Sequence, residues 1–103
     1  MTNYLLDKDH NVVETDDILE WATGFEMSNR RVDETTVGNI RISTVFLGLD
    51  HNMFGDKPAL FETMIFGGKY DEYMWRYAAW DEAVEGHKKA VKRVKKQLRK
   101  GSK

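Results

Sequence analysis

The sequence predicts an α+β domain, with an antiparallel β-sheet on which one short N-terminal helix and one long C-terminal helix pack. Short runs of β-branched and aromatic residues recur up to residue 77, and one helical periodicity then runs to about residue 100. The chain has 103 residues, 41% of them hydrophobic, which is enough for one domain with its own core. We therefore expect a single domain over residues 1–100 and a frayed tail at 101–103.

The first 27 residues predict a small hairpin followed by the short helix. Apolar runs at Tyr4–Leu6 and Val12–Glu14 flank a polar turn, in which Asn11 is suited to a left-handed conformation. The next segment, TDDILEWATGFEM, begins with Thr15 and Asp16, either of which can cap a helix. Apolar residues at helical spacing follow, so this segment predicts a short amphipathic helix.

Four strands are expected between residues 32 and 77. A Gly38–Asn39 turn separates RVDETTV from NIRISTVFLGL, which predicts a hairpin that leads into a long strand. PALFETMIF predicts the next strand, and HNMFGDKP forms a loop ahead of it. YMWRYA predicts the last strand, after a Gly67–Gly68 break. The aromatic residues around it are dense, and an exposed pair among them would favour a contact with a protein or a ligand.

The long helix is expected from about Trp80 to Lys100. Its apolar stripe recurs at intervals of three and four residues, and comprises Trp80, Val84, His87, Val91, Val94 and Leu98. Gly86 within a helix costs about 1 kcal/mol relative to Ala, so it predicts close packing against the sheet. His87 is then expected to be a half-buried core histidine.

The formal net charge of −1 hides a separation of charge along the chain. Residues 1–87 hold all 17 acidic residues and seven basic ones, a net charge of −10, whereas residues 88–103 hold nine basic residues and no acid. Three explanations of the basic end stay open: a match to the helix dipole, docking on the acidic body within one molecule or across a homodimer, and contact with nucleic-acid phosphates. The nucleic-acid candidates are Lys88, Lys89, Lys92, Arg93, Lys96 and Arg99.

Glu62 is the first candidate for a site. It shares one alternating row of its strand with the apolar residues Leu60, Met64 and Phe66. A carboxylate in such a row is costly unless it is paired, exposed or used. If the strands pair antiparallel around the two glycines, Arg76 lies opposite Glu62, and a structural cross-strand ion pair or a ligand-binding carboxylate would result.

Other chemistry finds less support. Asp50 and His51 end a hydrophobic strand, and a metal would need Glu62 and His87 as further donors, but no histidine pair has a metal-binding spacing. We assign no metal, no cofactor and no catalytic residue. The chain has no cysteine and no window that approaches the roughly 18 apolar residues of a membrane span, so a cytoplasmic location is expected and no membrane partner.

Residues 43–87 carry a family resemblance. STVFLGLDHNMFGDKPALFETMIFGG followed by WRYAAWDEAVEGH resembles a family of small uncharacterised phage and prophage proteins. The resemblance implies a phage accessory protein in a bacterial cytoplasm, and no mechanism. Such sequences have Thr or Ser before the Trp of the last helix, where this chain has Ala79, so its helix cap differs.

Three functions are weighed. The leading hypothesis is a non-enzymatic binding protein that recognises a host or phage protein, with a surface made by the 49–58 loop and nearby side chains: Asp50, His51, Glu62, Trp75, Arg76 and His87. The second is association with nucleic acid through the basic C-terminal helix. The third is a small enzyme or metal-binding protein that uses Asp50, His51, Glu62 and His87.

Overall fold

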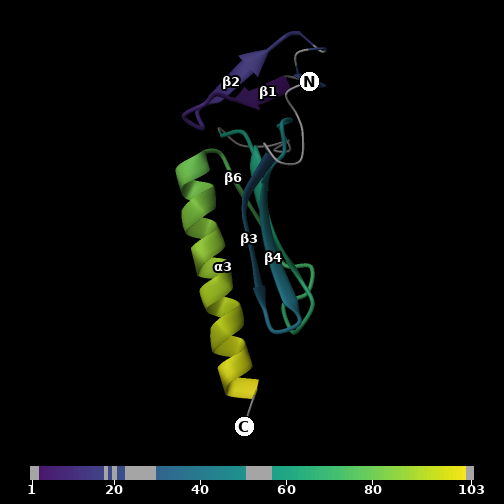
Figure 1. Ribbon diagram of the computed structural model, residues 1–103, viewed down its shortest axis with the longest axis vertical. Coiled ribbons are helices and arrows are strands. Elements are labelled where there is room, and N and C mark those ends of the chain that lie inside the picture. The colour runs from purple at the N-terminus through teal and green to yellow at the C-terminus, as the bar shows by residue number, and fades with distance from the viewer. Residues whose placement is uncertain (1–2, 18, 20, 23–29, 51–56, 102–103) are drawn as a thin grey trace.

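The structure is a computed structural model that describes residues 3–17, 19, 21–22, 30–50 and 57–101 (Figure 1). Its elements are β1 (Asn3–Leu6), β2 (Val12–Thr15), β3 (Arg31–Val37), β4 (Ile40–Phe46), β5 (Phe61–Phe66), β6 (Met74–Tyr77) and α3 (Trp80–Gly101). β1 and β2 form a two-stranded sheet, and the other strands form a four-stranded sheet in the order β3-β4-β5-β6. All neighbours are antiparallel, which confirms the predicted α+β fold.

The predicted N-terminal helix is not among the described elements, because most of its segment lies outside the described residues, but Leu19, Trp21 and Ala22, which are described, are helical. The described part includes one hydrogen bond of helical spacing, from the Trp21 N–H to the Asp17 carbonyl at 2.9 Å. Of the expected tail, Gly101 belongs to α3, and residues 102–103 lie outside the described part.

The turns follow the glycines, with one correction. Gly38 (φ 61°) joins β3 to β4, while Gly67 (φ 100°) follows β5, both in conformations that favour glycine. In the first hairpin the left-handed residue is His10 (φ 67°), and the prediction of Asn11 was wrong. Asn11 closes the turn instead, since its carbonyl accepts a hydrogen bond from the Asp7 N–H at 2.9 Å.

Helix α3 lies along one face of the four-stranded sheet (Figure 1). Its inward residues are Ala83, His87, Ala90 and Val94, and the buried residues of β4 and β5 lie beneath them. The core consists of two apolar clusters, one around Ile42, Ile65 and Val94 and one around Phe46, Phe61 and Ala83. The buried polar residues Thr44, Thr63 and His87 lie between the two clusters along β4, β5 and α3, respectively.

The opposite face of the sheet is called the outer face here. On β5, Phe61, Thr63 and Ile65 are fully buried toward the helix, so the alternating residues Glu62 and Met64 lie on the outer face. Within β5, the row that carries Glu62 is therefore turned away from the core, although Leu60, just before the strand, is buried in the core; this corrects the view of a carboxylate embedded in apolar surroundings. Phe66, in the same row, is 37% exposed.

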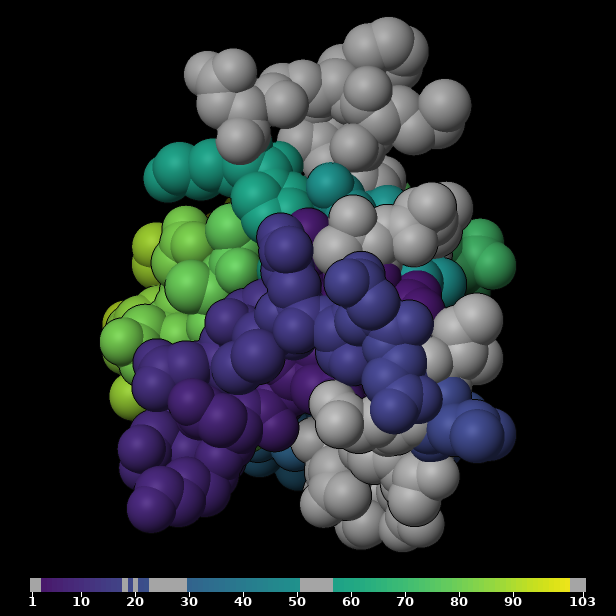
Figure 2. Space-filling view, turned by 90° about the horizontal axis from the view of Figure 1, so that it is seen from above, coloured from purple at the N-terminus to yellow at the C-terminus, as the bar shows by residue number. Residues whose placement is uncertain are grey.

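The molecule is elongated, with principal extents of 54 × 29 × 20 Å. The β1–β2 hairpin covers one end, as Figure 2 shows from that side, and the C-terminus of α3 lies at the other end (Figure 1). The Tyr4 N–H donates to the Gly48 carbonyl at 2.8 Å, and the His10 ring stacks on Trp80 with centroids 3.7 Å apart. Within the described residues, no helix has the length and apolar character that crossing a membrane requires.

Candidate functional site

Glu62 and Arg76 form the predicted cross-strand ion pair. They are direct partners in the register of β5 with β6, and Arg76 Nε donates to Glu62 Oε2 at 3.1 Å. The Arg76 side chain is 38% exposed and that of Glu62 is 17% exposed, so the pair lies at the surface of the outer face. A surface pair of this kind contributes about 0–1 kcal/mol and is a structural feature of the sheet.

The other binding candidates do not join this pair. Trp75 alternates with Arg76 on β6 and packs on the helix side of the sheet, where His87 is also buried. Asp50 Oδ1 accepts a hydrogen bond from the Ala59 N–H at 2.9 Å, which bridges the two ends of the 51–58 segment. His51 lies outside the described residues.

This arrangement also separates the donors proposed for an enzyme or a metal site. Glu62 is on the outer face, whereas His87 is buried on the helix face, so the sheet itself stands between them. Across the part of the chain that the structure describes, no three His, Cys, Asp or Glu side chains are grouped closely enough to hold a metal ion.

His87 is the most buried polar group on the helix. Its side chain is 2% exposed, which is deeper than the half-buried position expected from the sequence. The ring is held from both sides, with Nδ1 2.7 Å from Thr44 Oγ1 and Nε2 2.9 Å from Thr35 Oγ1. Thr44 Oγ1 in turn lies 2.5 Å from Thr63 Oγ1. Burial lowers the pKa of His87, and the Asp33 carboxylate 3.7 Å from Nε2 acts in the opposite direction.

The exposed side of α3 carries the positive charge. We define the basic face as eight exposed side chains on this helix: Lys88, Lys89, Lys92, Arg93, Lys95, Lys96, Arg99 and Lys100. Lys95 and Lys100 were not among the sequence candidates, although the same KRVKKQLRK run contains them. Lys88 lies 3.4 Å from Glu85, one turn earlier on the helix.

Eight of the described acidic residues lie toward the other end of the molecule, whereas exposed Asp71 and Glu72 lie on the turn after β5, next in sequence to Lys69 and Tyr70. Five exposed acids belong to the hairpin end, Asp7, Asp9, Glu14, Asp16 and Asp17, and three more occupy the start of α3, Asp81, Glu82 and Glu85. Among the described residues, Lys89, Lys92, Lys95, Lys96 and Lys100 form no ion pair with any of these. Within the described residues, these five lysines of the basic face therefore have no carboxylate partner from this group of acids.

A groove of about 720 Å³ runs beside the basic face, between α3 and the turn that joins β5 to β6. We call it the basic groove. Its lining residues are Lys69, Tyr70, Lys89, Lys92, Arg93, Lys96, Gln97 and Lys100. Five of its cations come from the helix and one, Lys69, comes from the turn on the opposite side. No Asp or Glu is among these described lining residues.

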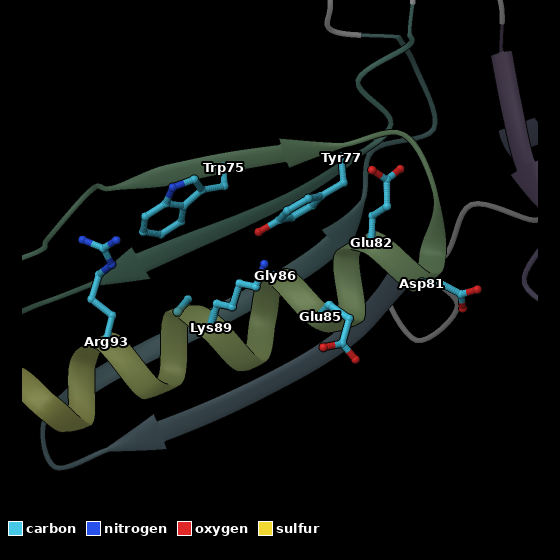
Figure 3. Close-up of a pocket in the computed structure, with 9 residues that line it drawn as sticks. Trp75, Tyr77, Asp81, Glu82, Glu85, Gly86, Lys89 and Arg93 are labelled. Carbon is cyan, nitrogen blue, oxygen red and sulfur yellow. The ribbon is translucent and has the colours of Figure 1, made fainter.

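Two further hollows flank α3. Next to the basic groove, a pocket of about 610 Å³ lies between β6 and the first half of the helix. Figure 3 shows its residues, with the Arg93 side chain directed from the helix toward Trp75 on the strand. The Arg93 guanidinium carbon is 5.7 Å from the Trp75 ring centre and 5.5 Å from that of Tyr70, within reach of cation–π attraction. On the β3 side, a groove of about 810 Å³ is lined by Asp33, His87, Lys88 and Lys95 among others.

Fold and site together define the class: an α+β domain with the long helix α3 on an antiparallel sheet and a cationic groove along that helix. Comparison of the chain with protein-family models, with curated proteins and with solved structures finds no match.

Proposed function

We propose that the protein binds nucleic acid through the basic face of α3. The observation that carries this proposal is the basic groove, in which six cations from two separate elements line one concave surface without a carboxylate among its described residues. Such a surface attracts the phosphate backbone, because cations that neutralise phosphates release the counterions condensed on it.

The helix dipole accounts for only part of this charge. It favours cations within the last turn, where Arg99 and Lys100 lie, and its effect does not extend to Lys88 or Lys92. The basic face also contains five like-charged pairs at i,i+4, such as Lys88 with Lys92, and each such pair destabilises a helix by about 0.2–0.5 kcal/mol. A polyanionic ligand would relieve this repulsion.

Recognition of a host or phage protein, the leading hypothesis from the sequence, remains a second candidate. The outer face favours it, since Phe66 and Met74 are 37% and 44% exposed there beside the Glu62–Arg76 pair. Nucleic acid is the stronger proposal because the charges of the outer face already form ion pairs with one another. Most cations of the basic groove form no ion pair with a described carboxylate. A bacterial cytoplasm, which we propose from the phage resemblance and the lack of cysteine, contains both kinds of target.

Charge reversal tests the proposal. We expect the double variant Lys92→Glu/Lys96→Glu to bind a fluorescent oligonucleotide at least tenfold more weakly than the unmodified protein in an anisotropy titration. The matched control is Lys8→Glu/Lys57→Glu, which changes the net charge by the same amount at two exposed lysines outside α3. The control should reduce affinity less than twofold. The logarithm of affinity should fall with the logarithm of salt concentration with a slope steeper than about −2.

Absence of binding at low salt would contradict the proposal, and so would an equal loss of affinity in both double variants. Truncation of the helix after residue 91 is a poor substitute for these variants, because it would also remove the buried Val94 from the core. A complex with a cellular protein that survives nuclease treatment would favour the second candidate.

A further inference from the structure

We infer that the basic groove holds single-stranded nucleic acid, with the phosphate backbone between Lys69 and the helix cations and a base stacked on Tyr73, which lies beside Tyr70 at the end of the groove. This inference rests on the proposed function and specifies its ligand. Proteins that bind single strands without sequence preference combine a cationic groove with aromatic rings, because every base has a face that can stack.

The two walls of the groove are the first support. Lys69 lies on the turn after β5, while Lys89, Lys92, Arg93 and Lys96 lie on α3. Cations on both sides of a concave channel suit one narrow chain of phosphates that passes between them. A duplex presents two strands on a convex surface, so its phosphates would meet the helix wall or the turn wall, and contacts with both would be harder to form.

The aromatic residues at the end of the groove are the second support. Tyr70 lines the groove, and the Tyr73 ring centre is 5.1 Å from that of Tyr70 and 6.1 Å from that of Trp75. Lys69 Nζ and the Arg93 guanidinium lie 5.8 and 5.5 Å from the Tyr70 ring centre. Cations and aromatic rings are therefore interleaved at one place, as a strand with phosphates and unstacked bases requires.

Tyr73 is the ring that is open to a ligand. It is 49% exposed, and with Phe66 it is one of two described aromatic side chains among the exposed large hydrophobics. Phe66 lies on the outer face, where Arg41 sits 4.2 Å from its ring centre, away from the groove. Tyr73 has no such cover from a described cation, and its neighbours Tyr70 and Trp75 hold it beside the groove.

Two labelled strands of equal length separate stacking from charge: a mixed-sequence DNA strand of about 12 nucleotides, and an abasic strand with the same number of phosphates. We expect the unmodified protein to bind the strand with bases at least tenfold more tightly than the abasic strand and more tightly than a duplex of the same sequence. The variant Tyr73→Ala should lose about tenfold toward the strand with bases and less than twofold toward the abasic strand.

Phe66→Ala is the matched control, since it removes an aromatic ring of similar exposure from the outer face. It should leave the affinity for both strands within twofold of the original. Tyr73→Phe retains the stacking ring and should keep the preference for the strand with bases, so it reports on stacking even if Tyr73→Ala folds poorly.

Each result decides one level of the argument. Equal affinity of the unmodified protein for the two strands, tighter binding of the duplex, or loss of the base preference in Tyr73→Phe overturns the inference and leaves the proposed function standing. Failure to bind any of the three probes overturns the proposed function itself.

Discussion

At the scale of single residues, His87 shows how a polar group is accommodated in the core. A neutral imidazole has one donor and one acceptor, and the Thr44 and Thr35 hydroxyls can each serve as either. Both ring nitrogens are therefore satisfied in either tautomer. The sequence placed His87 on the inward stripe of the helix, but its partners come from β3 and β4, and helix periodicity carries no information about them.

This environment predicts a dependence of stability on pH. Because burial lowers the pKa of His87 in the folded state, the unfolded chain binds a proton first as the pH falls below about 6.5. The free energy of unfolding should then decrease toward pH 5.5, by at most about 1.4 kcal/mol per pH unit for this one group. Asp33 on β3, which faces the ring, reduces the effect.

Urea denaturation at pH 7.5 and pH 5.5 measures this decrease. The variant His87→Gln should be less stable at pH 7.5, because it loses buried hydrogen bonds, yet it should lose less stability between the two pH values than the unmodified protein. His10 and His51 are present in both proteins, so the difference isolates His87. An identical loss in both proteins would contradict the prediction.

The residue just before α3 offers a stabilising substitution. The Ala79 carbonyl accepts the first helical hydrogen bond, from the Ala83 N–H at 3.1 Å, so Ala79 occupies the N-cap position without a capping side chain. Glu82 stands three residues later, where a capping box needs Glu. We expect Ala79→Ser to stabilise the protein by about 1 kcal/mol and to raise the melting temperature by about 4 °C or more, as measured by calorimetry.

A matched control for the cap is Ala78→Ser, one residue before the N-cap. It should change the melting temperature by less than the cap substitution does, because its hydroxyl is not placed to accept a bond from the first turn of α3. Equal effects of the two serines would show that the capping box does not form.

At the scale of elements, the distance between α3 and the sheet is set by small residues. Ala83 and Ala90 are buried, and a Cβ at Gly86 would overlap the ring and hydroxyl of Tyr77 on β6. The close packing predicted from Gly86 is therefore confirmed. The predicted stripe, which consists of larger residues, includes the buried His87 and Val94 but not the two alanines, which are also buried against the sheet.

The contact between Gly86 and Tyr77 predicts that the effect of Gly86→Ala on stability changes sign when the Tyr77 ring is removed. Gly86→Ala should destabilise the unmodified protein by about 1 kcal/mol, since the cost of overpacking exceeds the gain in helix propensity. In a Tyr77→Ala background the same change should stabilise by up to about 1 kcal/mol, because the ring that it would meet is gone. A double-mutant cycle of chemical denaturation measures both, and a stabilising Gly86→Ala in the original protein would refute the contact.

The strands show where sequence periodicity succeeds and where it stops. Alternation placed Glu62 opposite Arg76 and kept Trp75 on the other face, and both are confirmed. It did not decide which face of β5 is inward. The buried row is Phe61, Thr63 and Ile65, which carries no charged residue. The absence of a charge from one of the two rows was therefore the feature of the sequence that indicated the inward face.

At the scale of the whole molecule, the separation of charge along the sequence becomes in large part a separation in space, with Asp71 and Glu72 on the turn after β5 as exceptions. Acids of the hairpin and of the first turn of α3 gather at one end, and the basic face extends toward the other end of a molecule 54 Å long. The sequence predicted the two charged halves. It could not predict that Lys69 and Tyr70, which are 20 residues or so from the basic run, would close the groove, because that depends on the turn after β5 meeting the helix.

The division of charge between the two ends has a consequence for encounters in solution. A molecule that is negative at one tip and positive at the other turns in the field of a polyanion before it touches it, and the cationic tip arrives first. If the basic face binds a nucleic acid, as we propose, the same phosphates would repel the acidic hairpin, which would then point away from the bound strand.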